Sequence, residues 1–328
     1  MKKPRVFVTG SLWALFVYLM YNDLDDIKRT HYFLTDKGIP PSVRRNFKHH
    51  HVLNISWDDK LHSRLVHLLF IFIPFINRLR WPYLLWCDMW GIDQGLGIQS
   101  IIGRKSYTLI EDGAIDYMVD RNIKVQKGDW LRRLLWGPIY RHDIGRNDSC
   151  KRIILTQPAT NDILRAKAEE INLHKLWSEA SEEKKEYILR LFNLTSDDVE
   201  SMKKRKVILL TQPFSLDCHD FTDDDQIKMY HEMIKPYGEE NVIIKPHPRE
   251  KLSYQGAIPG TMVMDKPIPF QLFDVLGIKF DVAVTVSSTS IMCLVKGDTK
   301  IDFRGTTIDK RIEDALGMIT VESFTINK

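Results

Sequence analysis

Short apolar runs alternate along the chain with segments of helical hydrophobic periodicity. The first half opens with a strand at 5–8, a turn at Thr9-Gly10-Ser11, an apolar helix at 12–21 and a second strand at 30–34. A strand, a glycine turn and a helix in this order are typical of the start of a doubly wound α/β domain. Two further strands are expected in this half, at 107–110 and 152–156.

The second half repeats this pattern more clearly. Apolar strands are expected at 207–211, 241–245 and 281–286, with helices at 222–235 and 288–295. Strands of four to six residues that alternate with helices predict a parallel sheet covered on both faces. Ligands of such sheets bind outside the carboxyl ends of the strands, so the residues that directly follow each strand are the ones to examine for chemistry.

The length of 328 residues agrees with two domains of roughly 150 residues each. Polar helical sequence fills 161–194, and the basic cluster Lys203–Lys206 precedes the second α/β pattern. We therefore expect an α/β fold made of two Rossmann-like domains with parallel sheets. Their expected bounds are 1–150 for the N-terminal domain, 151–206 for a helical connecting region and 207–328 for the C-terminal domain.

One strongly apolar run, Leu65 to Ile76, is too short at 12 residues to span a bilayer, which takes about 20. It is interpreted either as a buried helix that Pro74 ends or kinks, or as a segment lying at a membrane surface. The second interpretation rests on the arginines and aromatic residues around it, because such residues favour the membrane interface. They are Arg64, Arg78, Arg80, Trp81, Tyr83 and Trp86, to which the more distant pair Arg132-Arg133 is added.

Composition excludes two classes of protein. With 44% hydrophobic, 27% charged and 10% aromatic residues, the chain has the profile of a packed globular protein rather than a disordered one. Forty-seven Lys and Arg against 43 Asp and Glu give a net charge of +4, which is too small to indicate a nucleic-acid partner. It suits an anionic small molecule or an anionic membrane surface.

The cysteines and the N-terminus favour a cytoplasmic protein, peripheral on the inner face of the cytoplasmic membrane if the apolar run touches lipid. The cysteines are widely spaced and lack a Cys-x-x-Cys pair, which indicates reduced thiols. The basic start of the chain resembles that of a signal peptide, but the sequence then becomes acidic and shows no small-residue cleavage site. The stretch His49-His50-His51 lacks nearby carboxylates and cysteines, so we interpret it as surface rather than as a metal site. The four cysteines are Cys87, Cys150, Cys218 and Cys293.

Lys245-Pro246-His247-Pro248 directly follows the strand expected at 241–245. The two prolines fix the backbone on either side of His247, which aims its imidazole. An aimed imidazole beside Lys245 and near Arg249 is suited to meet a phosphate and to donate a hydrogen bond or a proton to it. The alternative is a rigid turn with a structural histidine.

Ser287-Ser288-Thr289-Ser290 follows the strand expected at 281–286 and opens a helix. Hydroxyls and free backbone N–H groups at a helix N-terminus form an anion site, although one of these hydroxyls could be an ordinary N-cap. Glu111-Asp112-Gly113 follows the strand expected at 107–110, where a carboxylate could take a proton from an acceptor hydroxyl. An aimed histidine and hydroxyls in one domain and a carboxylate in the other suffice for group transfer from a phosphate, without metal or cofactor, if protein donors neutralise the leaving group.

The order Glu-Asp-Gly, Lys-Pro-His-Pro and Ser-Ser-Thr-Ser resembles the bacterial sialyltransferases of the GT-B type, and most of all glycosyltransferase family 52, the lipooligosaccharide sialyltransferases. The likeness extends to Gly91-Ile92-Asp93-Gln94 and to the stretches 109–117 and 209–213. It implies two Rossmann-like domains that face each other across a cleft. It further implies a CMP-sialic acid donor, inversion at the anomeric carbon, and a galactose-type hydroxyl of a lipooligosaccharide, capsule or exopolysaccharide as acceptor.

Carried over by position, the resemblance implies that His247 binds or protonates the CMP phosphate and that Ser287 and Ser288 hold its oxygens. Asp112 is the first choice for the base, with Glu111 and Gly113 in support. The loop after 207–211 offers Asp217 and Asp225 as rivals, although Asp225 is also placed to form a capping box with Thr222. Gln94 and Gln271 depart from the family pattern, which has His and Glu there. The implied donor-binding residues are Gln212, Lys245, Pro246, Phe270, Gln271, Ser287, Ser288 and Thr289.

Several alternatives stay open at this point. A relative could use a UDP-hexose or a CDP-glycerol donor, and a catalytically silent GT-B protein could act as a scaffold for polysaccharide assembly. The expected partners are a nucleotide sugar and an oligosaccharide or glycolipid acceptor, without nucleic acid. A homodimer and a peripheral membrane contact are also open.

Overall fold

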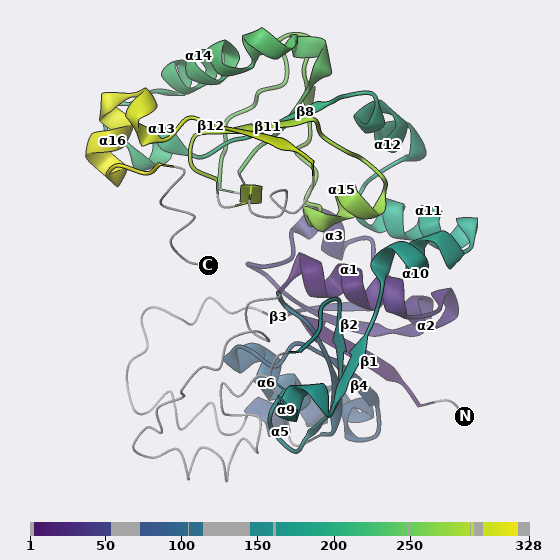
Figure 1. Cartoon of the computed structure of the whole chain (residues 1–328). Coiled ribbons are helices and arrows are strands. Elements are labelled where there is room, and N and C mark those ends of the chain that lie inside the picture. The colour runs from purple at the N-terminus through teal and green to yellow at the C-terminus, as the bar shows by residue number, and fades with distance from the viewer. Residues whose placement is uncertain are drawn as a thin grey trace. The chain divides into compact units, whose positions relative to one another are not determined.

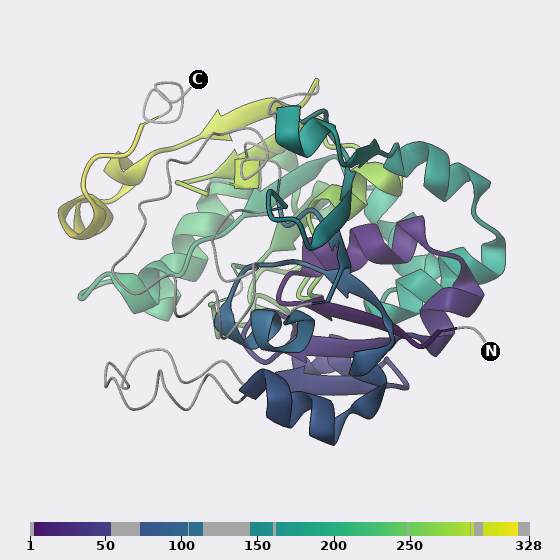
Figure 2. The same ribbon diagram turned by 90° about the horizontal axis from the view of Figure 1, so that it is seen from below.

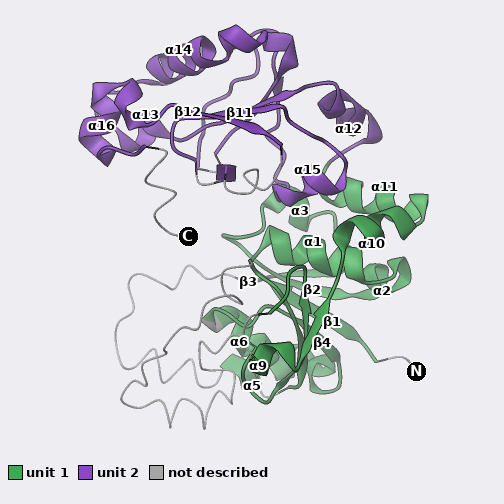
Figure 3. Ribbon diagram, viewed as in Figure 1, with its two compact units in different colours: residues 1–193 green, residues 194–328 purple. Residues whose placement is uncertain are grey.

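The computed structural model describes residues 3–53, 73–103, 105–113, 145–159, 162–247, 249–288, 290–291 and 298–320 (Figure 1). The chain divides into two compact units, Met1–Asn193 and Leu194–Lys328 (Figure 3). Each unit contains its own parallel sheet, which confirms the predicted α/β class.

The first unit contains a seven-stranded sheet in the order β3-β2-β1-β4-β5-β6-β7, whose purple and blue strands lie side by side in Figure 2. Every neighbouring pair is parallel. The strand order runs outward in both directions from the pair β1–β4, so the topological switch point of a doubly wound sheet lies there. The strands are β1 Arg5–Thr9, β2 His31–Thr35, β3 His50–Leu53, β4 Asp88–Gly91, β5 Tyr107–Ile110, β6 Cys150–Leu155 and β7 Ala168–Glu170.

Helices connect these strands, and the first of them supplies much of the core. Helix α1 runs from Leu12 to Tyr21, as the sequence predicts, because Ser11 caps it by accepting a hydrogen bond from the Ala14 N–H and the seven residues 14–20 are all buried. Tyr18 stacks on Phe7 of β1 with ring centroids 4.1 Å apart. The other elements described between strands are α2 Leu24–Arg29, α3 Pro41–Arg44, α5 Ile73–Arg80, η1 Pro82–Leu85, α6 Leu96–Ile102, α9 Asp162–Arg165, α10 Leu173–Glu179 and α11 Glu182–Leu191.

Gly91 allows β4 to lie against β1 at the switch point. A Cβ atom on Gly91 would lie 2.2 Å from the carbonyl oxygen of Val8, and the φ of Gly91, +154°, is one that residues with a side chain rarely adopt. Only glycine fits this position without moving a strand.

The second unit contains a five-stranded parallel sheet in the order β10-β9-β8-β11-β12, with its switch point between β8 and β11. Its core gathers apolar side chains from three strands and from α14, among them Leu209, Tyr230, Ile244 and Val284. The strands are β8 Val207–Leu210, β9 Val242–Lys245, β10 Met262–Val263, β11 Val282–Thr285 and β12 Lys300–Phe303. The α-helices described in this unit are α12 Ser196–Lys203, α13 Phe214–Asp217, α14 Asp223–Ile234, α15 Gln271–Val275 and α16 Lys310–Leu316, and short 3-10 turns accompany them at 235–237, 239–241 and 306–308.

The structure differs from the expected domain bounds. Strands β6 and β7 pair with β5 and extend the first sheet, so the first unit continues to Asn193 instead of ending at residue 150. The expected connecting region, 151–206, is therefore shared between the units, with α9, α10 and α11 in the first and α12 in the second. The helix expected at 288–295 falls largely outside the described residues.

Two expectations about the first unit also need correction. His50 and His51 begin β3 and are half-buried, so the stretch is an edge strand rather than surface; His51 lies against Phe33 and Trp81, with ring centroids 4.7 and 5.0 Å away. Residues 65–72 of the apolar run, with Arg64 and Arg132-Arg133, lie outside the described residues. Helix α5 continues past Pro74 to Arg80 and buries none of its side chains, so its described part is neither ended by Pro74 nor core.

Candidate active site

The loops at the carboxyl edge of the second sheet carry most of the candidate residues. Gln212 follows β8, Pro246 and His247 follow β9, and Ser287 with Ser288 follow β11. The segment after β10 leads to Phe270 and Gln271 at the start of α15. Because the strands are parallel and neighbouring, the sheet brings these loops to a single edge, as the sequence predicts. Pro248 and Thr289 lie outside the described residues.

The His247 imidazole is held by its own loop. Its Nδ1 accepts a hydrogen bond from the backbone N–H of Arg249 at 3.2 Å, so the neutral ring carries its proton on Nε2. Burial and then the neighbouring Arg249 guanidinium lower the pKa of His247, while Asp217 acts in the opposite direction. At neutral pH the ring is therefore a neutral hydrogen-bond donor through Nε2.

A half-buried carboxylate that the sequence motifs do not indicate, Glu250, organises this loop. Its Oε2 accepts hydrogen bonds from the backbone N–H of His247 at 2.8 Å and from the Thr211 hydroxyl at 2.5 Å. Its Oε1 accepts from the Gln226 amide at 2.7 Å and from the Tyr254 hydroxyl at 3.1 Å. Burial raises the pKa of Glu250 even though these hydrogen bonds favour the carboxylate. Glu250 thus ties the end of β8, the His247 loop and α14 together.

Lys245, the last residue of β9, indicates that the site binds an anion. Burial alone lowers the pKa of its ammonium to about 8. Within the described part of the chain its ammonium forms no ion pair, whereas nearby Arg249 pairs with both carboxylate oxygens of Asp217, at 3.0 and 2.6 Å. A buried cation without a counter-ion is costly, and a bound anion would relieve that cost.

The serine loop after β11 is partly fixed by the sheet. The Thr285 hydroxyl donates to the carbonyl oxygen of Leu210 at 2.9 Å and accepts from the backbone N–H of Ser288 at 3.0 Å. Ser288 is buried and Ser287 half-buried. Because the Ser288 N–H is already bonded within the loop, a ligand would meet the hydroxyls of the two serines rather than this N–H.

The carboxyl edge of the first sheet carries Glu111 and Asp112. Glu111 is only 2% exposed and accepts hydrogen bonds from Trp13 Nε1 at 2.9 Å, the Thr156 hydroxyl at 2.6 Å and the Thr156 N–H at 2.7 Å. Burial raises the pKa of Glu111, against these hydrogen bonds. Glu111 therefore joins the ends of β5 and β6 to α1, and half-buried Asp112 follows it directly, before Gly113, whose φ is +132°.

The rival carboxylate Asp225 is engaged in local structure. It closes a capping box at the start of α14, where its Oδ2 accepts from the Thr222 N–H and hydroxyl. The same oxygen pairs with Arg311 at 2.9 Å. Hydrogen bonds from Thr222 and Arg311 lower the pKa of Asp225, which makes it a weaker base.

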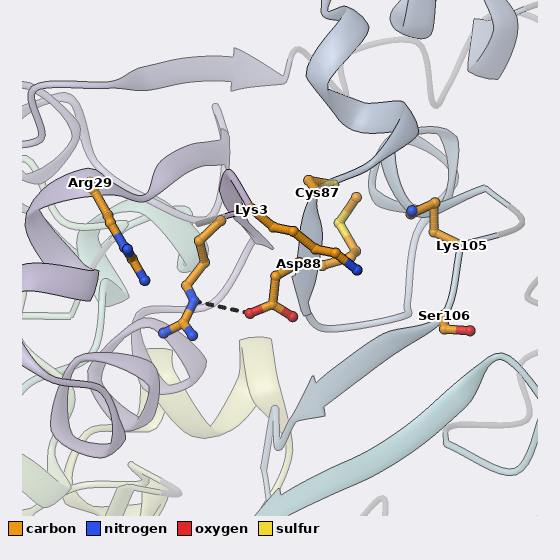
Figure 4. A pocket seen from close by; sticks show the side chains of 8 residues that line it. Lys3, Arg29, Cys87, Asp88, Lys105 and Ser106 are labelled. Carbon is orange, nitrogen blue, oxygen red and sulfur yellow. Dashed lines mark hydrogen bonds and ion pairs between the residues drawn. The ribbon is translucent and has the colours of Figure 1, made fainter. Parts of the chain in front are cut away.

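No three His, Cys, Asp or Glu side chains gather as a metal site within the residues that the structure describes. A cavity of about 480 Å³ lies at the amino edge of the first sheet, away from the residues above (Figure 4).

Two units that each contain a doubly wound parallel sheet are typical of the GT-B class of glycosyltransferases. The structure is similar to the GT-B domain of a sialyltransferase from Photobacterium damselae, with a TM-score of 0.55 and 12% identity over 91% of this chain and 90% of that one. It is also similar to a 2,6-sialyltransferase from a Photobacterium species, solved with CMP and lactose, with a TM-score of 0.52 and 10% identity over 91% and 71% of the chains. At such identities the likeness establishes the fold.

The sequence profile of glycosyltransferase family 52 matches residues 90–310, and the protein belongs to this family, as its motifs predict. An uncharacterized protein of Haemophilus influenzae is 34% identical over 218 residues, which are 66% of this chain and 68% of that protein. The protein is therefore a glycosyltransferase with the fold of bacterial sialyltransferases.

Proposed function

We propose that this protein is an inverting sialyltransferase that moves sialic acid from CMP-sialic acid to a galactose-type hydroxyl of a bacterial surface glycan. The observation that carries the proposal is the desolvated Lys245 ammonium, which forms no ion pair within the described residues and lies two positions before His247, whose neutral ring donates through Nε2. Together with the Ser287 and Ser288 hydroxyls, these donors match the needs of a singly charged phosphodiester.

In the proposed reaction an acceptor oxygen attacks the anomeric carbon of sialic acid from the face opposite to CMP. The bond between that carbon and the phosphate oxygen breaks, and CMP leaves with the electron pair. The acceptor proton passes to a carboxylate base. Neutral His247 stabilises the charge that develops on the phosphate by donating from Nε2, and Lys245 neutralises it, so the proposed chemistry requires no metal or other cofactor.

We assign the base to Asp112 rather than to Asp225. Glu111 already accepts three hydrogen bonds, and Asp225 is already engaged in its capping box and in an ion pair with Arg311. A base needs a carboxylate whose pKa is not depressed, which counts against Asp225.

The donor assignment is tested with a nucleotide panel and a turnover assay. CMP should raise the melting temperature of the protein more than UDP or CDP does, since CMP is the proposed leaving nucleotide. CMP-sialic acid with lactose should release CMP, and His247→Ala should lower kcat/KM roughly 10²–10⁴-fold. The matched control is His219→Ala, an exposed histidine of the same unit. Turnover of a UDP-hexose or of CDP-glycerol in place of CMP-sialic acid would refute the donor, and failure of every donor would favour a scaffold.

The base assignment is tested with Asp112→Asn and Asp225→Asn in the same assay. Asp112→Asn should lower kcat by a factor of roughly 10²–10⁴ with little change in the affinity for CMP. The exposed Asp148→Asn serves as the control in the same unit. Full activity of Asp112→Asn together with loss in Asp225→Asn would move the base to the second unit.

A further inference from the structure

Helix α5 and the turn that follows it expose large apolar side chains. Phe75 is 63% exposed, Leu79 66% and Trp86 51%. With Ile76 and Leu85 they form what we call the apolar patch. Neighbouring exposed apolar side chains of this size often mark an interaction site.

Helix α5 turns two polar side chains towards the protein. Asn77 donates to the Ser100 hydroxyl at 3.0 Å, and Arg78 donates to the carbonyl oxygen of Ile102 at 3.1 Å, and both residues are half-buried. Phe75, Ile76 and Leu79 share the opposite face by helical spacing and point outward. A helix that bonds polar side chains to the protein and exposes three large apolar side chains presents an apolar surface to a partner.

Cations adjoin the apolar patch. The Lys105 ammonium donates to the carbonyl oxygen of Leu85 at 3.0 Å and also lines the cavity of about 480 Å³ at the amino edge of the first sheet (Figure 4). Lys3, Arg5 and Arg29 line the same cavity. Cys87, which follows Trp86 in the chain, belongs to its wall, so patch and cavity are continuous.

The cavity has an excess of positive charge. Arg5 pairs with Asp88 at 3.1 Å and with Asp26 at 2.5 Å, and Arg29 also pairs with Asp26. Four cations less these two carboxylates leave a charge of +2.

We propose that this edge of the first unit docks on an anionic lipid bilayer, with the apolar patch at the level of the acyl boundary and the cavity holding a headgroup phosphate. Tryptophan, aliphatic side chains and neighbouring cations are the combination that binds such a surface. A second copy of this chain is a poorer occupant, because a symmetric contact through the patch would bring the two positive cavities towards each other.

The topology of the sheet agrees with this docking. The cavity lies at the amino ends of β1, β4 and β5, whereas Glu111 and Asp112 follow the carboxyl end of β5. The five residues of β1 separate the two edges by about 13 Å. A bilayer at the amino edge therefore leaves the carboxyl edge of this sheet in water.

Vesicle sedimentation tests the proposal on the full chain and does not depend on the donor. The protein should bind vesicles of phosphatidylcholine mixed with phosphatidylglycerol at least tenfold more tightly than phosphatidylcholine alone. The triple variant Ile76→Ser, Leu79→Ser, Trp86→Ser should lose this binding. Lys105→Gln should weaken it about fivefold and reduce its dependence on salt. The tryptophan-fluorescence urea midpoint of Lys105→Gln and the circular dichroism spectrum of each variant should match those of wild type, which shows that the first unit is intact.

Two matched controls separate docking from a general loss of surface apolarity or charge. Ile76 and Ile163 are isoleucines of the first unit with the same exposure, 53%, so Ile76→Ser should weaken binding while Ile163→Ser should not. Lys175→Gln, on α10, is the control for Lys105→Gln. Equal loss in the two isoleucine variants would overturn the proposal. So would a concentration-dependent dimer that the triple variant abolishes, or binding of glycerol phosphate without binding of vesicles.

Discussion

Glu250 offers the sharpest test of how the His247 loop is held. The substitution Glu250→Gln keeps the shape of the side chain but replaces one acceptor oxygen with an amide donor. Whichever way the new amide turns, it faces a group that can only donate there, the His247 N–H on one side or the Gln226 amide on the other. The Thr211 and Tyr254 hydroxyls can rotate to accept, but these two N–H groups cannot.

The expected loss of stability in Glu250→Gln follows from the hydrogen bonds of this side chain. The His247 N–H keeps the Thr211 hydroxyl as acceptor and the Gln226 amide keeps the Tyr254 hydroxyl, but the new amide N–H faces a donor and lacks an acceptor, which costs about 1–3 kcal/mol. The remaining bonds lose the contribution of the charge, about 1 kcal/mol in total. Burial raises the pKa of Glu250, so removing its charge recovers part of the cost of desolvation. We expect a net loss of about 2 kcal/mol in the stability of the second unit. Because the His247 N–H then keeps only its longer hydrogen bond to the Thr211 hydroxyl, at 3.1 Å, the loop is held less firmly and the affinity for CMP should fall roughly tenfold.

The assay uses the distribution of tryptophans, all eight of which lie between residues 13 and 177 in the first unit. Tryptophan fluorescence in a urea titration therefore follows the first unit, and circular dichroism follows both. Glu250→Gln should lower the urea midpoint seen by circular dichroism and leave the fluorescence midpoint in place. Glu232→Gln, on the exposed face of α14, should change neither. If the two variants unfold alike and bind CMP alike, the proposed role of Glu250 is wrong.

Three further predictions concern single positions. The donor KM should rise above pH 8 as Lys245 loses its proton, and Lys245→Arg, if active, should remove this alkaline limb; an unchanged limb would mean that another group titrates. The pKa of His51 is lowered to about 4, mainly by burial, so below pH 6.5 the unfolded chain takes up a proton before the folded chain does and folding stability falls. Between pH 7 and 4 the free energy of unfolding of wild type, measured by fluorescence in urea, should fall by about 1–2 kcal/mol more than that of His51→Gln, a range that allows for solvent screening. Parallel pH dependences of the two proteins would refute this. Gly91→Ala places a Cβ 2.2 Å from the Val8 carbonyl oxygen and should lower the free energy of unfolding by roughly 3 kcal/mol or more. Gly95→Ala, whose Cβ would have no atom within 4 Å, should lower it by about 1 kcal/mol in the same titration. Equal losses would contradict the close-packing argument.

The sequence predicts best those elements whose residues share one environment. Helix α1 and β5 are predicted to the residue because each is apolar, apart from Thr108, and bounded by polar residues. Strands β3 and β12, with the sequences HHVL and KIDF, mix polar and apolar side chains and are not recognised. The boundary at residue 150 fails for a related reason: nothing in the local sequence of β6 says which sheet it joins.

Prediction of the site has a similar limit. Local motifs place His247, Ser287 and Ser288 after strands, and the strand order then brings them to one edge. Glu250 escapes notice because its partners Thr211 and Gln226 are 39 and 24 residues away, so its role exists only in the folded chain. A carboxylate three residues after an aimed histidine is the one local sign that could have indicated it.

The placement of charge connects the proposed donor site with the proposed docking surface. A phosphodiester carries one charge, and a single desolvated cation suffices to meet it; Lys245 is such a cation, and its pKa of about 8 shows the cost of its burial. A bilayer presents many charges across water and calls for several cations, which Lys3 and Lys105 supply together with Arg5 and Arg29, whose charge Asp26 and Asp88 partly neutralise. Above pH 8 donor binding should therefore weaken while docking persists, since the guanidinium groups keep their charge.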